Sequence, residues 1–540
     1  MKPAARVRPV GDSALSVELG DGVDPSTSAR VRALDAALAR EPLAGVLETV
    51  PTFRALLVLF DPRRVSAGDV ADVALSRLRA PLPEEAAPRL HEVAARYGGE
   101  DGPDLVEVAH RTGLDPRRVV ELHTSREYTA FMLGFMPGFA YLGPVAPALS
   151  LPRRATPRPR VPAGSVAIAA GLTAVYPAAT PGGWHLLGRA AVRLFDPFAD
   201  PPARIRPGDR VRFVATDEIA PPWREPQAPN PPAGAAVLEV VDGGLLTTVQ
   251  DLGRVGRRRW GVGGAGAMDV GALAEANRLL GNPGRAAGLE CTATGPALRF
   301  LAPACFTVTG ADLGAVLHRA DLGAWPVPAG VRVRAREGNV LALEGRRHGC
   351  RAYVALGGGI DVPLVLGSRS TDLPGRFGGF EGRALRAGDR ICAGGIAAPP
   401  AAETPGPGFR TVDDVTTLRV IPGPQDDHFT AAATRRFLSA DYLVHATSDR
   451  VGCRLEGPPL AHAGPSEIVS DGMVPGCVQV PPDGQPIIMG PDSPTTGGYP
   501  KIATVITADR EHLAQLLPGH TRVRFEAVTV EQALRAMIGV

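Results

Sequence analysis

The chain has 540 residues, which is too long for one hydrophobic core, and typical domain sizes predict three or four units. Its hydrophobic fraction of 44% and charged fraction of 21% are ordinary for a globular protein and exclude global disorder. A formal net charge of +2, with acids and bases interspersed, excludes a surface that gathers nucleic acid or anionic lipid, so we expect a small-molecule or protein partner.

The first predicted unit, at 1–82, is a small α+β domain. The stretches "RVRPVGDSALSVEL" and "GVLETVPTFRALLVLF" alternate as strands do, whereas "DPSTSARVRALDAALA" and "GDVADVALSRLRA" have helical apolar spacing. Asp24 and Pro25 supply a cap and a first-turn proline. We therefore expect a β-α-β-β-α order. The N-terminus lacks the apolar run of a signal peptide, which favours a cytoplasmic protein.

The second predicted unit, at 83–216, contains two short helices, "DLVEVAHRTG" and "DPRRVVELHTS", followed by the aromatic stretch "FMLGFMPGFAYLG". Aromatic residues are only 5% of the chain, so this cluster is unusual. From Tyr128 the pattern predicts a strand covered on both faces. Gly134 marks a bulge or a close backbone approach, and Pro137-Gly138 predicts a turn. The uncharged run from Val161 reads as short strands and turns rather than a membrane helix.

An internal repeat predicts two related barrels. "VPAGSVAIAAGLTAVYPAATPGGWHLLGRA" aligns with "VPGCVQVPPDGQPIIMGPDSPTTGGYPKIA", and further on "IRPGDRVRFVAT" aligns with "LPGHTRVRFEAVT" in the same order. Short strands with Gly and Pro turns are typical of barrels. The expected fold is mainly β, with the α+β unit first and tandem barrels after it. "LRAGDRICAG" suggests a third barrel-like unit in the middle block.

Two proline-rich segments predict connectors, one at 217–235 and one near 394–408. They divide the rest of the chain, 236–540, into subunits near 236–392 and 412–540. The six cysteines are widely spaced without a C-x-x-C pair, which predicts reduced, mostly buried thiols.

The densest polar pattern is "TTVQDLGRVGRRRWGVGGAGAMDVGALAEANRLLGN" at 247–282. Gln250 and Asp251 end a predicted strand, and the loop that follows contains Gly253 and Arg254. Asp269 is placed to cap a helix or to help bind an anion. Glycines let backbone N–H groups converge on a carboxylate or phosphate, and arginine adds forked donors. The alternative is a solvated basic turn, which we favour for 257–259 over Arg254.

The two repeats differ at one informative place. The first has His185 after Gly-Gly-Trp, whereas the second has Gly497-Gly498-Tyr499-Pro500-Lys501. Lys501 is one of two lysines in a chain that otherwise uses arginine. Because lysine and arginine differ in hydration and reach, Lys501 is a candidate for a catalytic role or for binding an oxygen anion. The alternative is that this lysine has been retained by chance. His185 is a candidate binding residue or a core hydrogen-bond partner.

These motifs resemble known families. "EYTAFMLGFMPGFAYLG" with "TPGGWHLLGR" is similar to the family called allophanate hydrolase subunit 1, sensor-kinase inhibitor or the B component of 5-oxoprolinase. "GLLTTVQDLGRVGRRRWGVGGAGAMD", "SDRVGCRLEGP" and "PTTGGYPKIATV" are similar to its partner, allophanate hydrolase subunit 2 or the C component of 5-oxoprolinase, also called the biotin-dependent carboxyltransferase family. The resemblance covers nearly the whole chain and implies a B and C fusion with cyclophilin-like barrels.

The resemblance implies the B/C part of an ATP-dependent 5-oxoprolinase that acts with a separate A component and uses ATP and Mg²⁺. The alternatives are a urea carboxylase-like carboxyltransferase served by separate biotin proteins, or a sensor-kinase inhibitor. No biotin acceptor is present, since "GAMDV" has Asp269 where the lysine would be. On this reading Lys501, Asp251 and Gln250 are the candidate catalytic residues, and the candidate substrate or anion ligands are Arg254, Gly253, Asp269, Gly497, Gly498, His185 and Tyr499. The sequence leaves the true substrate and any homo-oligomer open.

Overall fold

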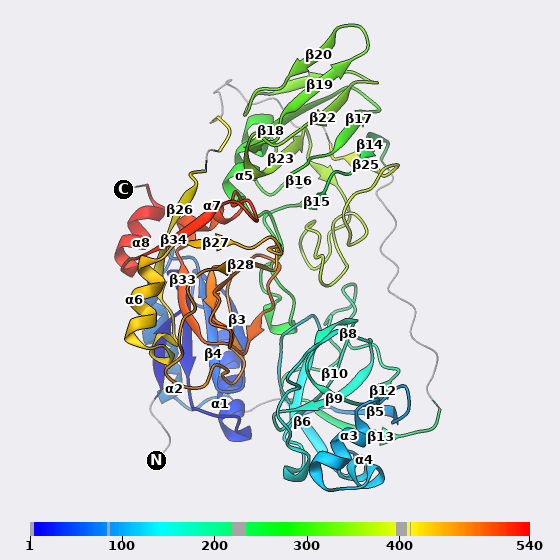
Figure 1. Ribbon diagram of the computed structural model, residues 1–540, viewed down its shortest axis with the longest axis vertical. Coiled ribbons are helices and arrows are strands. Elements are labelled where there is room, and N and C mark those ends of the chain that lie inside the picture. Colours follow the sequence, from blue (N-terminus) through cyan, green and yellow to red (C-terminus); the bar gives the residue numbers. More distant parts are fainter. Residues whose placement is uncertain (1–4, 84–86, 219–233, 396–407, 411, 540) are drawn as a thin grey trace.

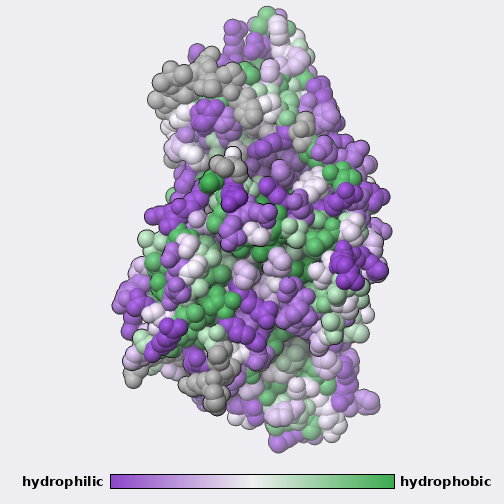
Figure 2. Space-filling view, turned by 90° about the vertical axis from the view of Figure 1, so that its left-hand side faces the viewer, coloured by the Kyte–Doolittle hydropathy of each residue, from purple (hydrophilic) through white to green (hydrophobic). Residues whose placement is uncertain are grey.

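The computed structural model describes residues 5–83, 87–218, 234–395, 408–410 and 412–539 (Figure 1). Most of the two predicted connectors therefore lies outside the described residues. Within the described parts, no helix is both long and apolar enough to cross a membrane. Hydrophilic and hydrophobic residues are intermixed over the face shown in Figure 2, as the composition predicts.

The N-terminal unit is a four-stranded sheet with two helices. The first predicted strand is in fact two, because Gly11, at a φ of 73°, allows the chain to turn back and pair β1 with β2. The order is therefore β-β-α-β-β-α, and the sheet order is β1-β2-β4-β3. Asp24 caps α1 as predicted. The elements are β1 (Arg6–Pro9), β2 (Ala14–Glu18), α1 (Pro25–Arg40), β3 (Val46–Pro51), β4 (Ala55–Phe60) and α2 (Ala67–Arg79).

The next unit is a closed barrel of seven strands in the order β10-β7-β6-β13-β5-β12-β9. The two predicted short helices are present, and Asp115 caps the second. The elements are β5 (Leu90–Tyr97), α3 (Leu105–Thr112), α4 (Pro116–Thr124), β6 (Glu127–Leu133), β7 (Ala140–Gly143), η1 (Pro147–Leu149), β8 (Arg158–Val161), β9 (Ser165–Ala169), β10 (Leu172–Val175), β11 (Thr180–Gly182), β12 (His185–Ala190) and β13 (Arg210–Ala215).

The middle block is not the third barrel that the sequence suggested. Its strands form two open sheets, β20-β19-β22-β17-β14-β25-β24 and β15-β16-β23-β18-β21, with α5 packed on β18 and β23. The elements are β14 (Ala236–Asp242), β15 (Leu246–Gln250), η2 (Arg258–Trp260), α5 (Val270–Leu280), β16 (Gly288–Thr292), β17 (Ala297–Phe300), β18 (Ala304–Asp312), β19 (Ala315–Arg319), β20 (Gly323–Pro326), β21 (Val333–Ala335), β22 (Val340–Leu343), β23 (His348–Leu356), β24 (Ile360–Asp361) and β25 (Arg390–Ala393).

The last unit is a second closed barrel of seven strands, in the order β26-β33-β30-β31-β28-β27-β34. The elements are β26 (Val415–Pro422), η3 (Asp426–His428), α6 (Ala431–Ser439), β27 (Tyr442–Val444), β28 (Gly452–Glu456), β29 (Asp471–Gly472), β30 (Cys477–Gln479), β31 (Ile487–Met489), β32 (Thr496–Gly497), β33 (Lys501–Val505), η4 (Thr507–Asp509), α7 (Arg510–Leu513), β34 (Arg522–Ala527) and α8 (Val530–Met537).

The two barrels have the same topology, which supports the predicted repeat. If β5 is matched with β26, each strand of the first ring has an equivalent strand at the same position in the second ring. Each ring closes through one parallel pair, β5 with β13 and β26 with β34. The aligned segments supply equivalent strands, β9 with β30 and β12 with β33. Trp184 and Tyr499 lie in the connections that enter those last two strands.

The aromatic stretch lies where the two halves of the chain meet. Its rings form a buried cluster, in which Phe139 packs edge-to-face on Tyr141 at 5.0 Å. Gly134 allows the other half to approach, because a Cβ there would lie 2.0 Å from Oγ1 of Thr496. The Phe135 N–H donates to the same oxygen at 3.2 Å. Both aromatic packing and a close approach by residue 496 therefore explain the cluster and its glycine.

The N-terminal unit packs on the second barrel, as Figure 1 shows for its blue ribbon beside the orange and red strands. Asp12 accepts hydrogen bonds from the backbone and the hydroxyl of Thr507, at 2.9 and 2.7 Å. A Cβ at Gly11 would touch Thr504 at 2.8 Å. The two halves of the chain are therefore interlocked rather than joined end to end. All six cysteines are free and four of them are buried.

Candidate functional site

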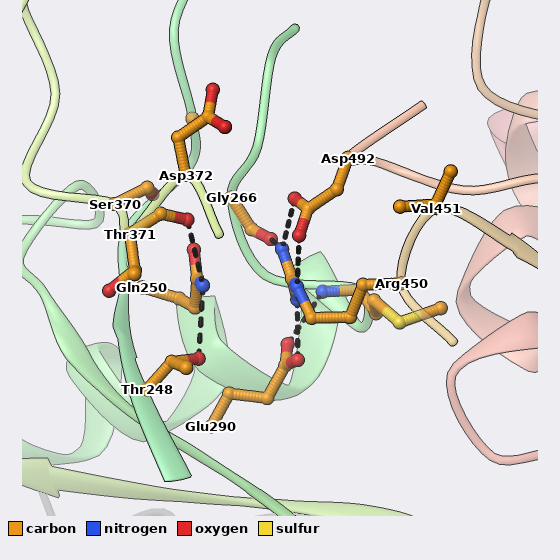
Figure 3. Close-up of polar contacts among 12 residues, drawn as sticks. Thr248, Gln250, Gly266, Glu290, Ser370, Thr371, Asp372, Arg450, Val451 and Asp492 are labelled. Carbon is orange, nitrogen blue, oxygen red and sulfur yellow. Dashed lines mark hydrogen bonds and ion pairs between the residues drawn. The ribbon is translucent and has the colours of Figure 1, made fainter. Parts of the chain in front are cut away.

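The strand β15 ends at Gln250, whose side chain is buried (Figure 3). Its amide nitrogen donates to the Thr248 hydroxyl at 3.0 Å and to the Thr371 carbonyl at 3.3 Å. Its amide oxygen has no hydrogen-bond partner within the described part of the chain. Since an unpaired buried acceptor is destabilising, this oxygen remains available to a donor.

The Asp251 carboxylate is saturated by donors from its own loop and from the segment at 365–377. One oxygen accepts from the Gly253 N–H at 2.8 Å and from the hydroxyls of Ser368 and Ser370, both at 2.6 Å. The other accepts from the Arg369 N–H at 2.7 Å. Four donors on one carboxylate fix the geometry of both segments, so Asp251 can position its neighbours but has little capacity left for a ligand.

Arg254 is buried against the same segment. Its Nε donates to the Val365 carbonyl at 3.2 Å, Nη2 donates to the Ser370 carbonyl, and the guanidinium lies 4.8 Å from the centre of the Phe377 ring. Burial lowers the pKa of Arg254, and the nearby Asp372 charge opposes that shift. Its Nη1 has no hydrogen-bond partner among the described residues. The side chain holds two backbone carbonyls and keeps one donor unused.

Arg450 forms a clamp between the middle block and the second barrel. It is 2% exposed, and Figure 3 shows Glu290 and Asp492 on opposite sides of its guanidinium. Asp492 receives a bidentate pair at 2.9 and 2.9 Å, Glu290 accepts from Nη1 at 2.5 Å, and the Gly266 carbonyl accepts from Nη2 at 2.7 Å. Against the effect of burial, the two carboxylates raise the pKa of Arg450. A buried, fully bonded ion cluster of this kind tolerates no loss of one member.

The carboxylates around this clamp differ in their preference for the charged form. Although burial opposes it, the Arg450 charge, followed by that of Arg351, holds the pKa of Glu290 below its ordinary range. Burial raises the pKa of Asp492 despite the bond to Arg450. Burial and the neighbouring Asp492 charge raise the pKa of Asp372 to about 6. The pKa of Asp372 therefore lies closer to neutral pH than that of an ordinary aspartate.

Sequence reasoning missed this clamp. Arg450, Glu290 and Asp492 come from three separate segments, and no spacing rule links single residues so far apart. The available signals were weak, namely the position of Arg450 within "SDRVGCRLEGP" and of Asp492 just before the second copy of the Thr-Gly-Gly pattern. Only the fold brings them together.

Asp269 is the N-cap of α5. Its carboxylate accepts from the Ala272 N–H at 2.8 Å and from the Gln515 side chain at 2.9 Å, and its own N–H donates to the Tyr353 hydroxyl at 2.8 Å. The capping prediction for Asp269 is confirmed. Its carboxylate thereby ties the middle block to the second barrel.

Lys501 is the first residue of β33 and is fully buried. Its backbone N–H donates to Oε1 of Gln425 at 3.3 Å, whereas its Nζ has no hydrogen-bond partner within the described residues. The register with β30 shifts next to Lys501, because Lys501 pairs with Gln479 whereas Ala503 pairs with Val478. The structure thus provides a buried amine with its donors unused, which is the property that a catalytic lysine needs.

The residues before Lys501 are held by Gln479. Its Nε2 donates to the Tyr499 carbonyl at 3.2 Å and would clash with a Cβ at Gly497, at 2.4 Å. Gly497 also pairs with Asp471 across β32 and β29. A Cβ at Gly498 would lie 3.5 Å from the Arg153 guanidinium of the first barrel. Gly497 therefore permits a close approach to this connection, whereas a Cβ at Gly498 would make only ordinary contacts.

His185 occupies the same place in the first barrel, at the start of β12. It is fully buried, its Nε2 faces the Pro152 carbonyl at 2.9 Å, and its Nδ1 has no partner within the described ranges. The structure therefore places His185 and Lys501 in two different barrels, and it places Gln250, Asp251 and Arg254 in the middle block. Within the described residues, no hydrogen bond joins the side chains of His185, Gln250 and Lys501 to one another.

The loop at 258–266 is the element that contacts all the units. The prediction of a solvated basic turn is wrong for Arg258 and Arg259, because both are ion-paired with the N-terminal unit. Arg258 lies 3.2 Å from Glu48, and Arg259 lies 2.7 Å from Asp35. Sequence alone could not reveal this, since the paired carboxylates lie far upstream in a separate unit.

Further along this loop, both barrels form hydrogen bonds with its backbone. The Trp260 carbonyl accepts from the Gly138 N–H of the first barrel at 2.9 Å. The Ala265 N–H donates to the Pro491 carbonyl of the second barrel at 3.1 Å. Together with the bond from Arg450, these contacts make the loop at 258–266 the joint between the N-terminal unit, both barrels and the middle block.

The fold and this shared loop define a carboxyltransferase-domain protein with tandem barrels, and comparison with known families agrees. Residues 260–527 match the family described as carboxyltransferase domain, subdomain A and B, and residues 5–205 match carboxyltransferase domain, subdomain C and D. The chain belongs to the carboxyltransferase-domain family.

Within this family, the chain joins a part similar to the B component of 5-oxoprolinase to a part similar to its C component. It is 39% identical over 300 residues to the 5-oxoprolinase C component of Escherichia coli K12, covering 56% of this chain and 94% of that protein. It is 38% identical over 224 residues to the 5-oxoprolinase B component of Bacillus subtilis 168, covering 39% of this chain and 93% of that protein.

Solved structures show the same relation. The crystal structure of TTHA0988 aligns with a TM-score of 0.83 at 37% identity, covering 96% of this chain and all of that one. The Kluyveromyces lactis urea carboxylase aligns with a TM-score of 0.51 at 30% identity, covering 56% of this chain but 28% of that enzyme. The likeness to TTHA0988 therefore includes both halves, whereas the likeness to urea carboxylase is partial.

Proposed function

We propose that this chain is the combined B and C components of an ATP-dependent 5-oxoprolinase. In this role it activates 5-oxo-L-proline for ring opening to L-glutamate together with a separate A component. The observation that supports this most strongly is coverage: one chain contains nearly the whole length of proteins named as the B and C components of 5-oxoprolinase. The interlocked halves fit two proteins that act as one unit.

The proposed chemistry needs positioning more than a strong base. Opening an unstrained lactam is unfavourable, and ATP can drive it by transferring its γ-phosphoryl group to the amide oxygen, with release of ADP. Water then adds to the activated carbon and the ring C–N bond breaks, with a proton going to the ring nitrogen, which leaves a carboxyl phosphate. A second water molecule hydrolyses this carboxyl phosphate to L-glutamate and phosphate. Such steps are accelerated by donors aimed at the oxygen atoms that gain negative charge.

We assign Lys501 as the candidate catalytic group, because its buried ammonium has no hydrogen-bond partner among the described residues. Asp251 and Arg254 act as positioning residues for the segment at 365–377, since their side-chain donors and acceptors are mostly used there. Gln250 keeps one buried acceptor for orienting a ligand or a neighbouring donor.

ATP and Mg²⁺ enter this proposal through the resemblance. Across the described parts of the chain, no group of three or more His, Cys, Asp or Glu side chains is spaced to hold a metal ion. Mg²⁺ bound to ATP needs few protein ligands, since phosphates and waters supply most of its coordination.

The test is ADP release by the purified chain with the A component added. We expect release to require both 5-oxoproline and the A component. ADP release that does not depend on 5-oxoproline would contradict the proposal. So would the absence of ADP release in every combination of the chain, the A component and 5-oxoproline.

A carboxyltransferase function is the second candidate. The clamp lies within residues 260–527, which match the carboxyltransferase-domain family, and the chain aligns in part with a urea carboxylase. This function predicts that the chain moves a carboxyl group from carboxybiotin on a separate protein to urea or another amide. Carboxyl transfer without ADP release in the same preparation would favour this candidate over the first.

A further inference from the structure

A pocket of about 320 Å³ lies between the N-terminal sheet and the second barrel. Arg8, Glu18 and Arg54 line it from the N-terminal unit, and Gln425 and His428 line it from the segment around η3. Because the two walls come from opposite ends of the chain, the pocket exists only when the N-terminal unit is docked on the second barrel.

Three of the residues that line this pocket carry side-chain nitrogen atoms that lack partners. Nε of Arg54, Nε2 of Gln425 and Nδ1 of His428 are all buried, and none has a hydrogen-bond partner among the described residues. A buried polar atom that is left unpaired destabilises the folded protein. Three such atoms around one cavity indicate a site built to receive a polar molecule rather than a packing defect.

Two of the arginines that line the pocket already have bonding partners in the chain. Arg8 joins the two units, donating to the Pro424 carbonyl at 2.9 Å and to Asp427 at 3.2 Å. The buried Glu18 carboxylate lies between Arg6 and Arg8, at 3.3 and 3.7 Å, and Asp21 also pairs with Arg6, so both arginines have carboxylate partners.

Arg54 is in a different position. Its Nη1 makes a long hydrogen bond to the Gly20 carbonyl, at 3.4 Å, and its Nε has no partner within the described residues. Asp21, Asp427 and Glu467 also line the pocket, and Arg54 is the lining arginine that has no carboxylate partner in the described part of the chain. Its guanidinium is thus the one available to an anionic ligand, and a guanidinium binds a carboxylate with matched geometry.

Gln425 connects the pocket to Lys501. The backbone N–H of Lys501 can only donate, so the amide oxygen of Gln425 faces it and the amide NH₂ group is directed elsewhere. The side chain is 2% exposed, and its NH₂ group is a donor with no partner in the described chain. An amide donor next to the candidate catalytic strand suits a carbonyl oxygen.

We propose that this pocket binds a small molecule carrying both a carboxylate and an amide carbonyl, with Arg54 holding the carboxylate and Gln425 donating to the carbonyl oxygen. The inference rests on the proposed function, because 5-oxoproline belongs to this chemical class, and it names the residues that would select it. The cavity volume lies at the small end of ligand sites, which fits a single-ring substrate.

The experiment is calorimetric titration of the full chain without ATP or the A component. The probes are 5-oxoproline, N-acetylglycine as a linear carboxylate amide, and 2-pyrrolidinone, which has the lactam but no carboxylate. We expect 5-oxoproline to bind at least about tenfold more tightly than 2-pyrrolidinone, since a charge-assisted pair is lost in the latter.

Two variants and one control locate the site. Arg54→Gln is expected to weaken the binding of 5-oxoproline at least about tenfold and to leave the affinity for 2-pyrrolidinone unchanged. Gln425→Glu keeps an oxygen for the Lys501 N–H but removes the amide donor. It is therefore expected to weaken the binding of both 5-oxoproline and 2-pyrrolidinone. Arg63→Gln removes an exposed arginine of the same unit, which pairs locally with Asp61, and is expected to change neither.

The outcomes separate the pocket from the function. Wild-type affinity for 5-oxoproline in folded Arg54→Gln and Gln425→Glu variants overturns the pocket and leaves the ADP-release test standing. Binding of N-acetylglycine that depends on Arg54, in a chain that shows no ADP release with 5-oxoproline, supports the pocket and rejects the proposed function. Absence of binding by every probe overturns the inference.

Discussion

The two barrels have one topology but hold the loop at 258–266 by different means. In the first barrel, the turn before β7 presents Gly138, whose backbone N–H bonds Trp260. In the second, the turn before the equivalent strand β28 presents Arg450, whose side chain bonds Gly266 and two carboxylates. The same place in a duplicated scaffold has become a backbone contact in one copy and an ion clamp in the other.

The same divergence appears at the start of β12 and β33. His185 has one nitrogen facing a carbonyl oxygen, whereas Lys501 has an amine without a partner in the described chain. Topology is thus shared, while the polar side chain at this place differs between the two copies. If this is correct, substitutions in the second barrel should have larger effects than matched ones in the first.

The largest expected effect is on stability, from Arg450→Met. Removing the guanidinium leaves Glu290 and Asp492 buried without their partner, which costs about 3–5 kcal/mol. Chemical denaturation followed by circular dichroism measures the loss. Arg454→Met, an exposed position in β28, is the matched control and should change stability by no more than about 0.5 kcal/mol. Equal stability of the two variants would show that the clamp is dispensable.

Lys501→Arg tests the chemical difference between the barrels. We expect a folded protein whose turnover falls on the order of 100-fold, because a planar guanidinium cannot place its charge where a compact ammonium does. His185→Gln should leave turnover close to wild type. Steady-state ADP release with the A component, beside melting curves, measures both. Near wild-type turnover in Lys501→Arg would remove the site assignment.

Gly134→Ala sharpens the contact between the halves. Its new methyl group would meet Thr496 at 2.0 Å, and overpacking of this kind costs about 1–3 kcal/mol. Met136→Leu conserves volume in the same stretch and should cost less than about 1.5 kcal/mol. Adding Thr496→Ala to Gly134→Ala should recover part of the loss. A double variant no more stable than Gly134→Ala alone would place the strain elsewhere.

Sequence patterns predicted the features that depend on short-range rules. The caps at Asp24 and Asp269, the helices at 105–124 and the duplicated barrel strands all follow from local spacing. Gly134 was expected to mark a close approach, but the pattern could not name its neighbour, because Thr496 lies in the other half of the chain.

The predictions that failed depend on tertiary context. The stretch "LRAGDRICAG" has the sequence pattern of a strand that closes a barrel, yet β25 pairs with β14 and β24 in an open sheet. A strand pattern alone does not specify which neighbouring strands would complete a ring. Arg258 and Arg259 look like surface charges until Glu48 and Asp35 meet them. The unpaired nitrogen atoms of Arg54 and Gln425 have no sequence signature at all.

The smallest effect is expected from Asp372→Asn, which tests whether charge sets the stability of the junction around the clamp. The folded-state pKa of Asp372 is raised to about 6, whereas its ordinary value is 3.8, so the folded protein binds this proton more tightly than the unfolded chain. Stability from this group is therefore fully present below about pH 4 and is lost as the pH rises to about 6.

Asparagine at position 372 keeps an oxygen for the Gly375 N–H and cannot ionise. We therefore expect Asp372→Asn to melt a few degrees above wild type near pH 8 and at the same temperature near pH 4, as measured by calorimetry across that range. A constant difference at every pH would mean that packing, rather than the buried charge beside Asp492, sets the stability of this junction.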